Sequence, residues 1–297
     1  MTLRALQFRV FRRGSVSYFT AAAFFPRRIR REVASLYAFV RTADDMVDAV
    51  PPDEEGFEAL AAAWEAAAAG RPSGNPLVDD FAALSARRRF DPAWTRLFLA
   101  SMRRDLAGAP FAGLDDALGY VHGSAEVVGL FLCRVLGLGD AAFPAARLMG
   151  RAMQWANFLR DVGEDAGRGR RYLPPGDGVP DVPGEDWARR NPGAFARWFR
   201  GQAALYREWD QGAREGLGLI PRRCRVPVAV AADAYRRTVA VLEADPYLTY
   251  RRKVRPSRAW LAYRAAANAA SACFGRKTKT PGVPRGDAGR LTDPERN

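Results

Sequence analysis

The chain has 297 residues, 48% of them hydrophobic and 27% charged, which is typical of a globular protein and excludes a disordered one. A chain of this length buries roughly 75% of its unfolded surface on folding, so it needs neither a disulfide nor a metal staple. Its three cysteines form no CxxC pair and its single histidine is His122, which excludes a disulfide framework and His-rich metal sites.

The net charge is +13, from 46 Lys and Arg against 33 Asp and Glu. Such a charge predicts an anionic partner (phosphorylated small molecules, an acidic membrane surface or nucleic acid), unless it only reflects the arginine bias of a GC-rich genome. No stretch is long and apolar enough to span a bilayer, and the N-terminus lacks the apolar region of a signal peptide. We therefore expect a cytoplasmic protein that can attach peripherally to the inner face of an anionic membrane.

Helix-forming residues dominate nearly the whole chain, and the period-two alternation of strands is missing. Prolines mark the starts or breaks of many segments. The expected helices span 27–50, 53–69, 76–88, 92–106, 111–137, 141–165, 185–190, 194–217, 224–244 and 256–273. A loop rich in Gly, Pro and Arg is expected at 167–184, and a disordered basic tail at 276–297. The chain is therefore predicted to form one all-α helical domain over 1–275.

The first chemical motif lies near the end of the first of these helices. One arginine and three aspartates follow the spacing i, i+3, i+4, i+7, which places them on one helix face: Arg41, Asp44, Asp45 and Asp48. Residues 33–40 before them are mostly apolar, so the carboxylates end a buried helix. A hard divalent cation, above all Mg²⁺, would relieve their mutual repulsion. The alternative is a solvated acidic patch.

The helix expected at 141–165 carries a similar face. Four polar side chains lie there at i, i+3, i+4 and i+8: Asn157, Arg160, Asp161 and Asp165. Asn and Asp offer oxygen ligands for Mg²⁺, and Arg160 offers a guanidinium to a phosphate. Gln154, one turn earlier, adds a ligand or a water contact. Two such faces opposed across a bundle would hold a cluster of Mg²⁺ ions against a diphosphate, and the pair is far more specific than either half.

With these residues the chain resembles the squalene/phytoene synthase family over roughly residues 14–265. Residues 41–48 match the family's R-x-x-D-D-x-x-D motif, and 154–165 with 170–174 match its second aspartate-rich motif, which is followed by R-x-Y-L-P. Residues 120–129 resemble a Y-x-x-G-x-A-G-x-x-G segment, with Glu126 where a glycine is usual. The remaining resemblances lie at 15–18 (an S-x-S-F motif with Tyr18 in place of Phe), 231–235 and 247–252.

The resemblance implies an isoprenoid-synthase-type bundle with a central cavity, in which two allylic diphosphates are joined head to head. It implies catalytic roles for Arg41, Asp44, Asp48, Asp161, Tyr120 and Tyr172. It implies metal ligands at Asp44, Asp48, Asn157, Asp161 and Asp165. It implies diphosphate contacts from Ser15, Ser17, Tyr18, Tyr37, Arg41, Gln154, Arg160, Tyr235 and Arg252. For each helical tyrosine, packing in the core is the alternative.

The expected reaction joins two geranylgeranyl diphosphates to phytoene through a cyclopropylcarbinyl diphosphate, with Mg²⁺ or alternatively Mn²⁺ and without NADPH. Small residues on the helices that lead to the cavity are predicted to leave a deep apolar tunnel: Ala21, Ala22, Ala23 and Ala34. Family members with thirty-carbon products tend to carry bulky aromatics at the places of Ala22 and Ala34. If these alanines only pack helices closely, a squalene or dehydrosqualene synthase acting on farnesyl diphosphate is the alternative.

Three other functions compete with this interpretation. An arginine-rich helical protein could bind nucleic acid, but no helix-turn-helix, RNP or KH signature is present and two aspartate faces would repel phosphates, so no nucleic acid is expected. A catalytically inactive assembly factor would not need Asp44, Asp48, Asn157 and Asp161. A head-to-tail elongase or a terpene cyclase also uses aspartate-rich helices, but the R-x-Y-L-P segment favours head-to-head coupling.

Overall fold

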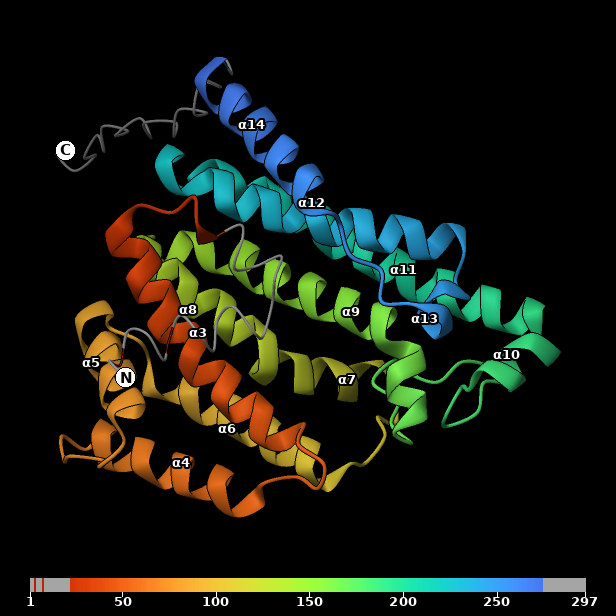
Figure 1. The fold of residues 1–297 in the computed structure, drawn as a ribbon, viewed down its shortest axis with the longest axis horizontal. Coiled ribbons are helices and arrows are strands. Elements are labelled where there is room, and N and C mark those ends of the chain that lie inside the picture. The colour runs from red at the N-terminus through yellow and green to blue at the C-terminus, as the bar shows by residue number, and fades with distance from the viewer. Residues whose placement is uncertain (1–2, 4–6, 8–21, 275–297) are drawn as a thin grey trace, which may run out of the picture.

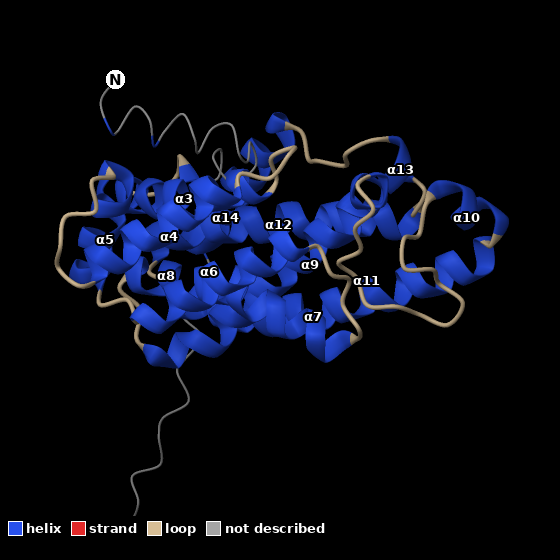
Figure 2. Ribbon diagram, turned by 90° about the horizontal axis from the view of Figure 1, so that it is seen from below, coloured by secondary structure: helices blue, strands red, loops and turns tan. Residues whose placement is uncertain are grey.

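The computed structural model describes residues 3, 7 and 22–274, and these form one helical domain (Figure 1). Its helices are α3 (Arg27–Val47), α4 (Glu54–Ala68), α5 (Pro76–Arg88), α6 (Pro92–Ala107), α7 (Leu114–Val121), α8 (Val127–Leu136), α9 (Phe143–Gly167), α10 (Glu185–Arg190), α11 (Pro192–Glu215), α12 (Arg222–Ala244), α13 (Leu248–Arg251) and α14 (Arg258–Phe274). Three short turns connect some of them: η1 (His122–Glu126), η2 (Asp140–Ala142) and η3 (Gly216–Leu219). Residues 22–274 contain no strand (Figure 2), so the predicted all-α class is confirmed.

Local capping explains why several predicted boundaries agree with the structure. Pro76 and Pro92 occupy the first turns of α5 and α6, where a missing N–H costs nothing. The side chain of Asn75 accepts a hydrogen bond from the N–H of Leu77 (3.1 Å), and Asp91 accepts one from Ala93 (2.9 Å). The helix expected at 27–50 instead ends at Val47, because the prolines at 51 and 52 disfavour helical backbone before them.

The prediction of one continuous helix over 111–137 was wrong, because the structure divides this segment. Helix α7 begins only at Leu114, and the π-helical turn η1 separates it from α8. A Cβ on Gly123 would lie 2.1 Å from Ser101 Oγ and 2.5 Å from the Leu97 carbonyl oxygen, so α6 packs directly on this turn. The short helix α13 was not predicted, although it docks on α9 beside the motif residues.

Helix α9 runs through the middle of the molecule and packs against α8, η1, α11, α12 and α13 (Figure 1). Helices α4, α5 and α6 pack with α3 on one side of it, and α11, α12 and α14 lie on the other side. Each side has its own apolar core. Phe39 stacks on Phe81 with 4.0 Å between ring centroids in the first, and Trp155 meets Trp209 edge-on at 5.0 Å in the second.

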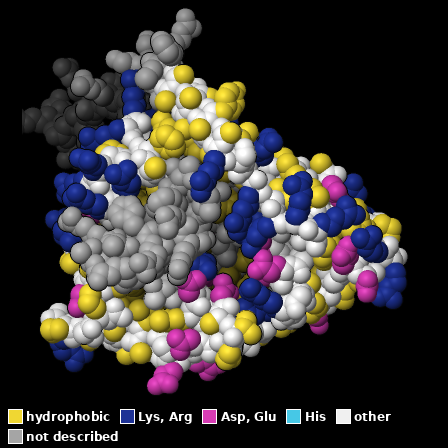
Figure 3. Space-filling view, in the orientation of Figure 1, with side chains coloured by type: hydrophobic (Ala, Val, Ile, Leu, Met, Phe, Trp, Pro, Cys, Tyr) yellow, Lys and Arg dark blue, Asp and Glu magenta, His cyan; other side chains and the backbone are white. Residues whose placement is uncertain are grey.

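The surface shows where the positive charge collects. In Figure 3, Lys and Arg side chains lie over both sides of the face. On the right, Asp and Glu side chains lie among them, whereas few acidic side chains accompany those at the upper left, where α3 and α12 begin in Figure 1. No helix of the described part of the chain is sufficiently long and apolar to cross a membrane. Ser15, Ser17, Tyr18, Ala21 and the tail predicted at 276–297 lie outside the described residues.

Candidate active site

A cavity of about 350 Å³ lies between α3, α8, α9 and α12. Most of its wall is aliphatic or aromatic. Many of the polar side chains come from α3 and α9: Tyr37, Arg41, Asp44, Gln154, Asn157 and Arg160. Such a chamber suits a ligand with a long apolar chain and a charged head, because the chain is buried while the head meets charged groups.

The α3 face begins with Arg41 and Asp44, which both line the cavity. Arg41 donates to Asp44 at 2.5 Å and also pairs with Asp45, whose side chain is 56% exposed. Burial raises the pKa of Asp44 to about 7, helped by the neighbouring charges of Asp48 and Asp105 and opposed by Arg41. One turn later, Asp48 lies 4.0 Å from Arg168 and 3.8 Å from Arg170. The carboxylates of this face therefore have arginine neighbours that only partly balance their repulsion.

The α9 face continues the polar end of the cavity. Asn157 donates to Gln154 (3.4 Å), and both line the cavity with Arg160. Arg160 also donates twice to Asp161, at 2.9 and 2.5 Å. Burial raises the pKa of Asp165 to about 8, and the charges of Asp161, Glu164 and Asp48 add to the effect. The predicted residues of this motif thus share one face, as their spacing requires.

The segment that follows helix α13 supplies a cation that the motif spacing did not predict, and α13 positions it. The Gly163 N–H donates to Thr249 Oγ1 (3.2 Å), and that hydroxyl donates to the carbonyl of Arg160 (3.0 Å). A Cβ on Gly163 would come within 2.5 Å of the Thr249 carbonyl oxygen, so only glycine permits this approach. The contact brings Lys253 Nζ to 2.7 Å from Glu164 and 3.3 Å from Asp161.

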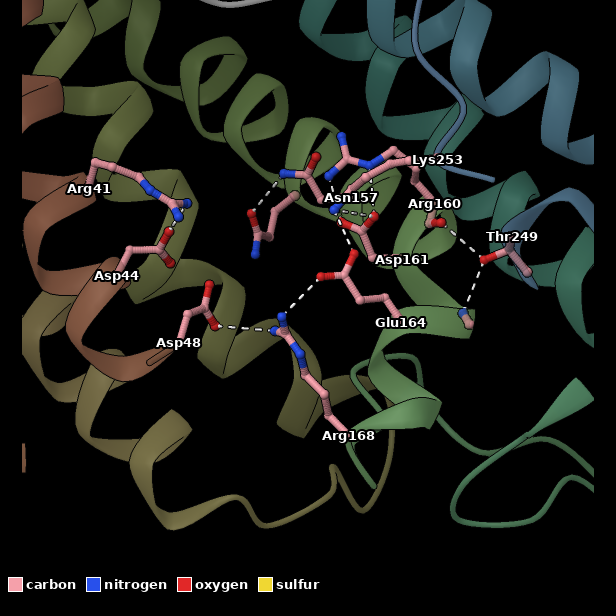
Figure 4. Close-up of polar contacts among 12 residues, drawn as sticks. Arg41, Asp44, Asp48, Asn157, Arg160, Asp161, Glu164, Arg168, Thr249 and Lys253 are labelled. Carbon is pink, nitrogen blue, oxygen red and sulfur yellow. Dashed lines mark hydrogen bonds and ion pairs between the residues drawn. The ribbon is translucent and has the colours of Figure 1, made fainter. Parts of the chain in front are cut away.

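The two faces oppose each other across the site. Figure 4 shows Asp44 of α3 and Asp48, directly after α3, on one side and Asp161 and Glu164 of α9 on the other, with the Arg168 guanidinium between them. Arg168 lies 3.1 Å from Glu164 and 4.0 Å from Asp48. In residues 22–274, no three carboxylate, imidazole or thiol groups are grouped tightly enough to hold a metal ion. The donor set nevertheless fits a hard divalent cation, because its donors are carboxylate and amide oxygens that repel one another without one.

Asp105 of α6 is a further group at this site that the sequence analysis missed. Tyr120 donates to it at 2.5 Å, and Tyr172 also hydrogen-bonds to it. Burial raises its pKa to about 6, with Asp48 adding to the effect, while the two tyrosines and Arg170 oppose it. Tyr172 in turn stacks on Phe158, with 5.0 Å between ring centroids. Asp105 thereby fixes both tyrosines whose aromatic rings the sequence pattern had singled out.

At the α12 side the structure places Tyr235 and Arg255 at the cavity. Burial raises the pKa of the Tyr235 phenol, opposed by the Arg160 charge and by a hydrogen bond with Asn157. Arg252, expected to contact a diphosphate, is exposed and does not line the cavity, whereas Arg255, which is also exposed, does line it. The reason is that α13 ends at Arg251 and the extended backbone that follows carries Arg255 back to the site.

Only one of the four alanines predicted to shape the tunnel does so among the described residues. Ala22 is 2% exposed and lines the cavity. Ala34 is equally buried but packs in the core without lining the cavity, and Ala23 is exposed. The size argument for the substrate therefore depends on Ala22.

Glu126, which replaces the usual glycine, does not enter the cavity. Its side chain is fully buried behind the cavity wall, where it accepts hydrogen bonds from Arg147 (2.9 Å) and Arg151 (2.6 Å) and contacts His122 Nδ1 at 2.9 Å. Burial alone would raise the pKa of Glu126, but these three hydrogen bonds bring it below its ordinary value. The neighbouring Ala125 still lines the cavity, so the substitution leaves the wall intact.

Comparisons with known proteins agree with this geometry. The chain matches the squalene/phytoene synthase family over residues 11–260. It is 32% identical over 262 residues to the 15-cis-phytoene synthase of a Paracoccus species, covering 83% of this chain and 84% of that one. It is 30% identical over 241 residues to the 15-cis-phytoene synthase of Pantoea ananas, covering 75% and 77%. Its fold is similar to that of a dehydrosqualene synthase in a crystal structure with a ligand, with a TM-score of 0.76, 22% identity and coverage of 90% and 95%.

The helical bundle has the isoprenoid-synthase-type fold, and the family match adds that it is a prenyltransferase. Because the family match and the sequence similarity extend over most of its length, the chain belongs to the squalene/phytoene synthase family. Enzymes of this family condense two prenyl diphosphates head to head, as the sequence resemblance implied.

Proposed function

We propose that this protein condenses two molecules of geranylgeranyl diphosphate to phytoene. The observation that carries the proposal is an apolar cavity with two opposed carboxylate faces and several arginines at one end. The apolar wall suits the prenyl chains and the charged end suits their diphosphates. The names of the relatives at 32% and 30% identity support the forty-carbon product.

The reaction balances without a reductant. The C1–O bond of one substrate breaks, the C2=C3 double bond of the other attacks the resulting allylic cation, and loss of a proton closes a cyclopropane ring. The second diphosphate then leaves, the carbocation rearranges to a 1–1′ linkage, and loss of another proton forms the central double bond. Two diphosphates and two protons are released, so NADPH is not expected.

The charged side chains stabilise the leaving groups. Arg41, Arg160 and Arg255 line the cavity and offer guanidinium groups to the departing diphosphates. The side chains proposed to hold a divalent cation are Asp44, Asp48, Asn157, Asp161 and Asp165. When bound there, Mg²⁺ (or Mn²⁺) would supply positive charge that lowers the barrier to diphosphate departure.

The cavity wall protects the carbocations from water. Tyr120 lines the cavity, and its ring lies 6.0 Å from that of Tyr172 and 6.2 Å from that of Phe158. Aromatic faces attract cations, and a buried wall without free water prevents their capture as alcohols. Asp105 holds both phenols through hydrogen bonds and so keeps the rings in place.

The proposal extends to the surroundings in which the enzyme works. We infer a cytoplasmic protein that contacts the inner face of an anionic membrane, since the net charge is +13 and the reaction consumes and produces oily molecules. The substrates are the small-molecule partners, and no nucleic acid is expected. The thirty-carbon alternatives, squalene and dehydrosqualene, would require farnesyl diphosphate to fit the same cavity.

A single incubation tests the proposal. The purified protein is given farnesyl or geranylgeranyl diphosphate with Mg²⁺, with and without NADPH, and the apolar extract is analysed by mass spectrometry. We expect phytoene from geranylgeranyl diphosphate irrespective of NADPH. Coupling of farnesyl but not geranylgeranyl diphosphate would overturn the chain-length assignment, and no coupled product from either would overturn the function.

A further inference from the structure

The end of the cavity remote from the carboxylates is built by two segments far apart in sequence. Residues 22–25 precede α3, and residues 217–220 lie between α11 and α12. Ala22, Phe25, Leu217 and Ile220 from these segments all line the cavity. Helix α3 rises about 1.5 Å per residue, so its start lies roughly 25 Å from Asp44. Figure 1 shows α3 and α12 beginning at the same end of the molecule, away from the loop that follows α9.

Each of these segments also exposes a large apolar side chain beside a cavity residue. Phe24 is 44% exposed while Phe25 is 6% exposed, and Leu219 is 53% exposed while Ile220 is 8% exposed. A single exposed apolar residue is ordinary on a protein surface. Here, however, two exposed apolar residues are each adjacent in sequence to a residue that lines the same cavity. They mark the outer surface at the end of the cavity remote from the carboxylates, its hydrocarbon end, as an apolar contact surface.

The charge around these two side chains has one dominant sign. Segments 22–31 and 215–225 contain seven arginines and one carboxylate, Glu215. Among these arginines, four are exposed without an acidic partner in the described part of the chain: Arg27, Arg31, Arg222 and Arg223. Figure 3 shows the corresponding crowding of Lys and Arg where α3 and α12 begin. A surface that combines apolar side chains with arginines is complementary to an anionic lipid bilayer, whose headgroups attract the arginines and whose acyl region accepts the apolar groups.

We propose that this hydrocarbon-end face, made of Phe24, Leu219 and the arginines at 27, 31, 222 and 223, docks on an anionic bilayer. Docking places the apolar end of the cavity against the acyl region, so the hydrocarbon product enters the membrane from the end opposite to its former diphosphates. The product-release part rests on the proposed function, whereas the docking itself does not. Nucleic acid fits this face less well, because its phosphates would pair with the arginines but would leave Phe24 and Leu219 without an apolar partner.

The docking experiment measures co-sedimentation with vesicles of phosphatidylglycerol and phosphatidylcholine, and with vesicles of phosphatidylcholine alone. Two double variants test the face: Phe24→Ser with Leu219→Ser, and Arg222→Glu with Arg223→Glu. Matched controls at the α10 end of the molecule are Val182→Ser, 37% exposed, and Arg197→Glu with Arg200→Glu on exposed positions of α11. Thermal unfolding and turnover in detergent micelles verify that each variant is folded, since none of the substituted residues lines the cavity.

We expect wild type to bind the anionic vesicles and to lose binding as salt rises, because the attraction is electrostatic. Both face variants should bind at least about tenfold more weakly, a loss expected from removing two such contacts, while the controls stay within about twofold. Equal binding to neutral vesicles, unchanged binding of the face variants, equal loss in the controls, or displacement of vesicles by RNA would each overturn the proposal.

A second readout separates docking from the reaction. With geranylgeranyl diphosphate as substrate, the face variants should keep turnover in micelles but transfer less of the product into vesicles. A wild type that docks through this face but forms no coupled product would remove the proposed function and leave the docking surface. A wild type that forms phytoene but does not bind the anionic vesicles would support the proposed function and contradict the docking surface.

Discussion

Two clusters of buried charge differ in how well their carboxylates are paired, although α9 contributes side chains to both. Behind the cavity wall, Glu126 is surrounded by two arginines and His122, and these contacts lower its pKa. At the polar end of the cavity, Asp44 and Asp165 have other carboxylates among their neighbours, and their pKa values rise to about 7 and about 8. The first cluster is electrostatically complete within the chain, whereas the second gains stability from added positive charge.

This difference separates a structural role from a functional one. A buried carboxylate whose hydrogen-bond donors all come from the protein connects neighbouring helices, here η1 and α9. It needs no bound ligand to balance its charge. Carboxylates that repel one another in a cleft are costly to the fold and persist where they bind something. The comparison therefore predicts that substitutions in the two clusters affect different properties: turnover in one, stability in the other.

The largest effect is expected from the carboxylates of the two opposed faces. Asp48→Ala and Asp161→Ala each remove a proposed metal ligand, which should lower turnover at least about 1,000-fold, since a metal contributes several kcal/mol to charge stabilisation. The fold should survive, as measured by circular dichroism. Chelation of divalent cations with EDTA should abolish wild-type activity, and added Mg²⁺ should restore it.

The exposed Asp115 of α7 offers a matched control for these variants. Asp115→Ala removes a carboxylate of the same type outside the site and should leave turnover within about twofold. Wild-type-like turnover in both Asp48→Ala and Asp161→Ala would contradict the assignment of these residues as metal ligands.

The second effect concerns stability. Glu126→Ala leaves the partly exposed Arg147 and Arg151 without their buried partner and should cost about 1–3 kcal/mol of unfolding free energy, measured by urea denaturation. Glu126→Gln keeps the shape and part of the hydrogen bonding, so its loss should be smaller and its turnover near that of wild type. If Glu126→Gln instead lost turnover while keeping its stability, the two clusters would not be separate.

The same residue predicts a pH dependence. Because the folded pKa of Glu126 lies below its unfolded value of about 4.3, its stabilising contribution is complete above that value and disappears as the pH falls through the folded pKa. Wild type should therefore lose more stability than Glu126→Gln between pH 5 and pH 3. Parallel acid unfolding curves for the two proteins would contradict this.

The sequence predicted the helices and motif faces well because both depend on local spacing. The start of α5 follows from Asn75 and Pro76, and the placement of Asn157, Arg160 and Asp161 on one face follows from helical periodicity. The misses were tertiary. The π turn at 122–126 depends on packing against α6, and the approach of Lys253 to Glu164 spans 89 positions along the chain.

Asp105 illustrates the same limit. In the sequence it stands in an ordinary amphipathic helix, with two arginines directly before it and no acidic motif around it. Only the fold brings it to Tyr120 and Tyr172, which lie in two other segments. To predict Asp105 as a site residue, one must know which face of α6 points toward the cavity, and the spacing of residues in the sequence does not give that.

A smaller change, in substrate preference, is expected from the apolar wall of the cavity, which lies outside both charge clusters. Ala22→Phe adds a ring where the cavity wall is now a methyl group, so the space for the longer prenyl chain shrinks. The ratio of turnover with farnesyl to turnover with geranylgeranyl diphosphate should rise about tenfold, because one methylene of misfit is worth about 1–3 kcal/mol. Ala23→Phe, at an exposed neighbouring position, is the control and should leave the ratio unchanged.

The smallest expected effect is a change in stability at Asp165, one of the carboxylates that repel one another at the site. Burial and the charges of Asp161 and Glu164 raise the folded pKa of Asp165 to about 8, above its unfolded value of about 3.9. A raised pKa means that this group favours folding below pH 4 and that the contribution is lost as the pH rises through about 8. Without divalent cations, Asp165→Asn should therefore be more stable than wild type at pH 8, by about 1 kcal/mol, and the gain should shrink at pH 4. Thermal unfolding in EDTA measures this difference, with the exposed Asp115→Asn as control. Added Mg²⁺ should stabilise wild type more than Asp165→Asn, because the variant has lost the repulsion that the cation relieves. A variant less stable than wild type at pH 8 in EDTA would show that Asp165 is as well paired as Glu126, and the contrast between the clusters would fail.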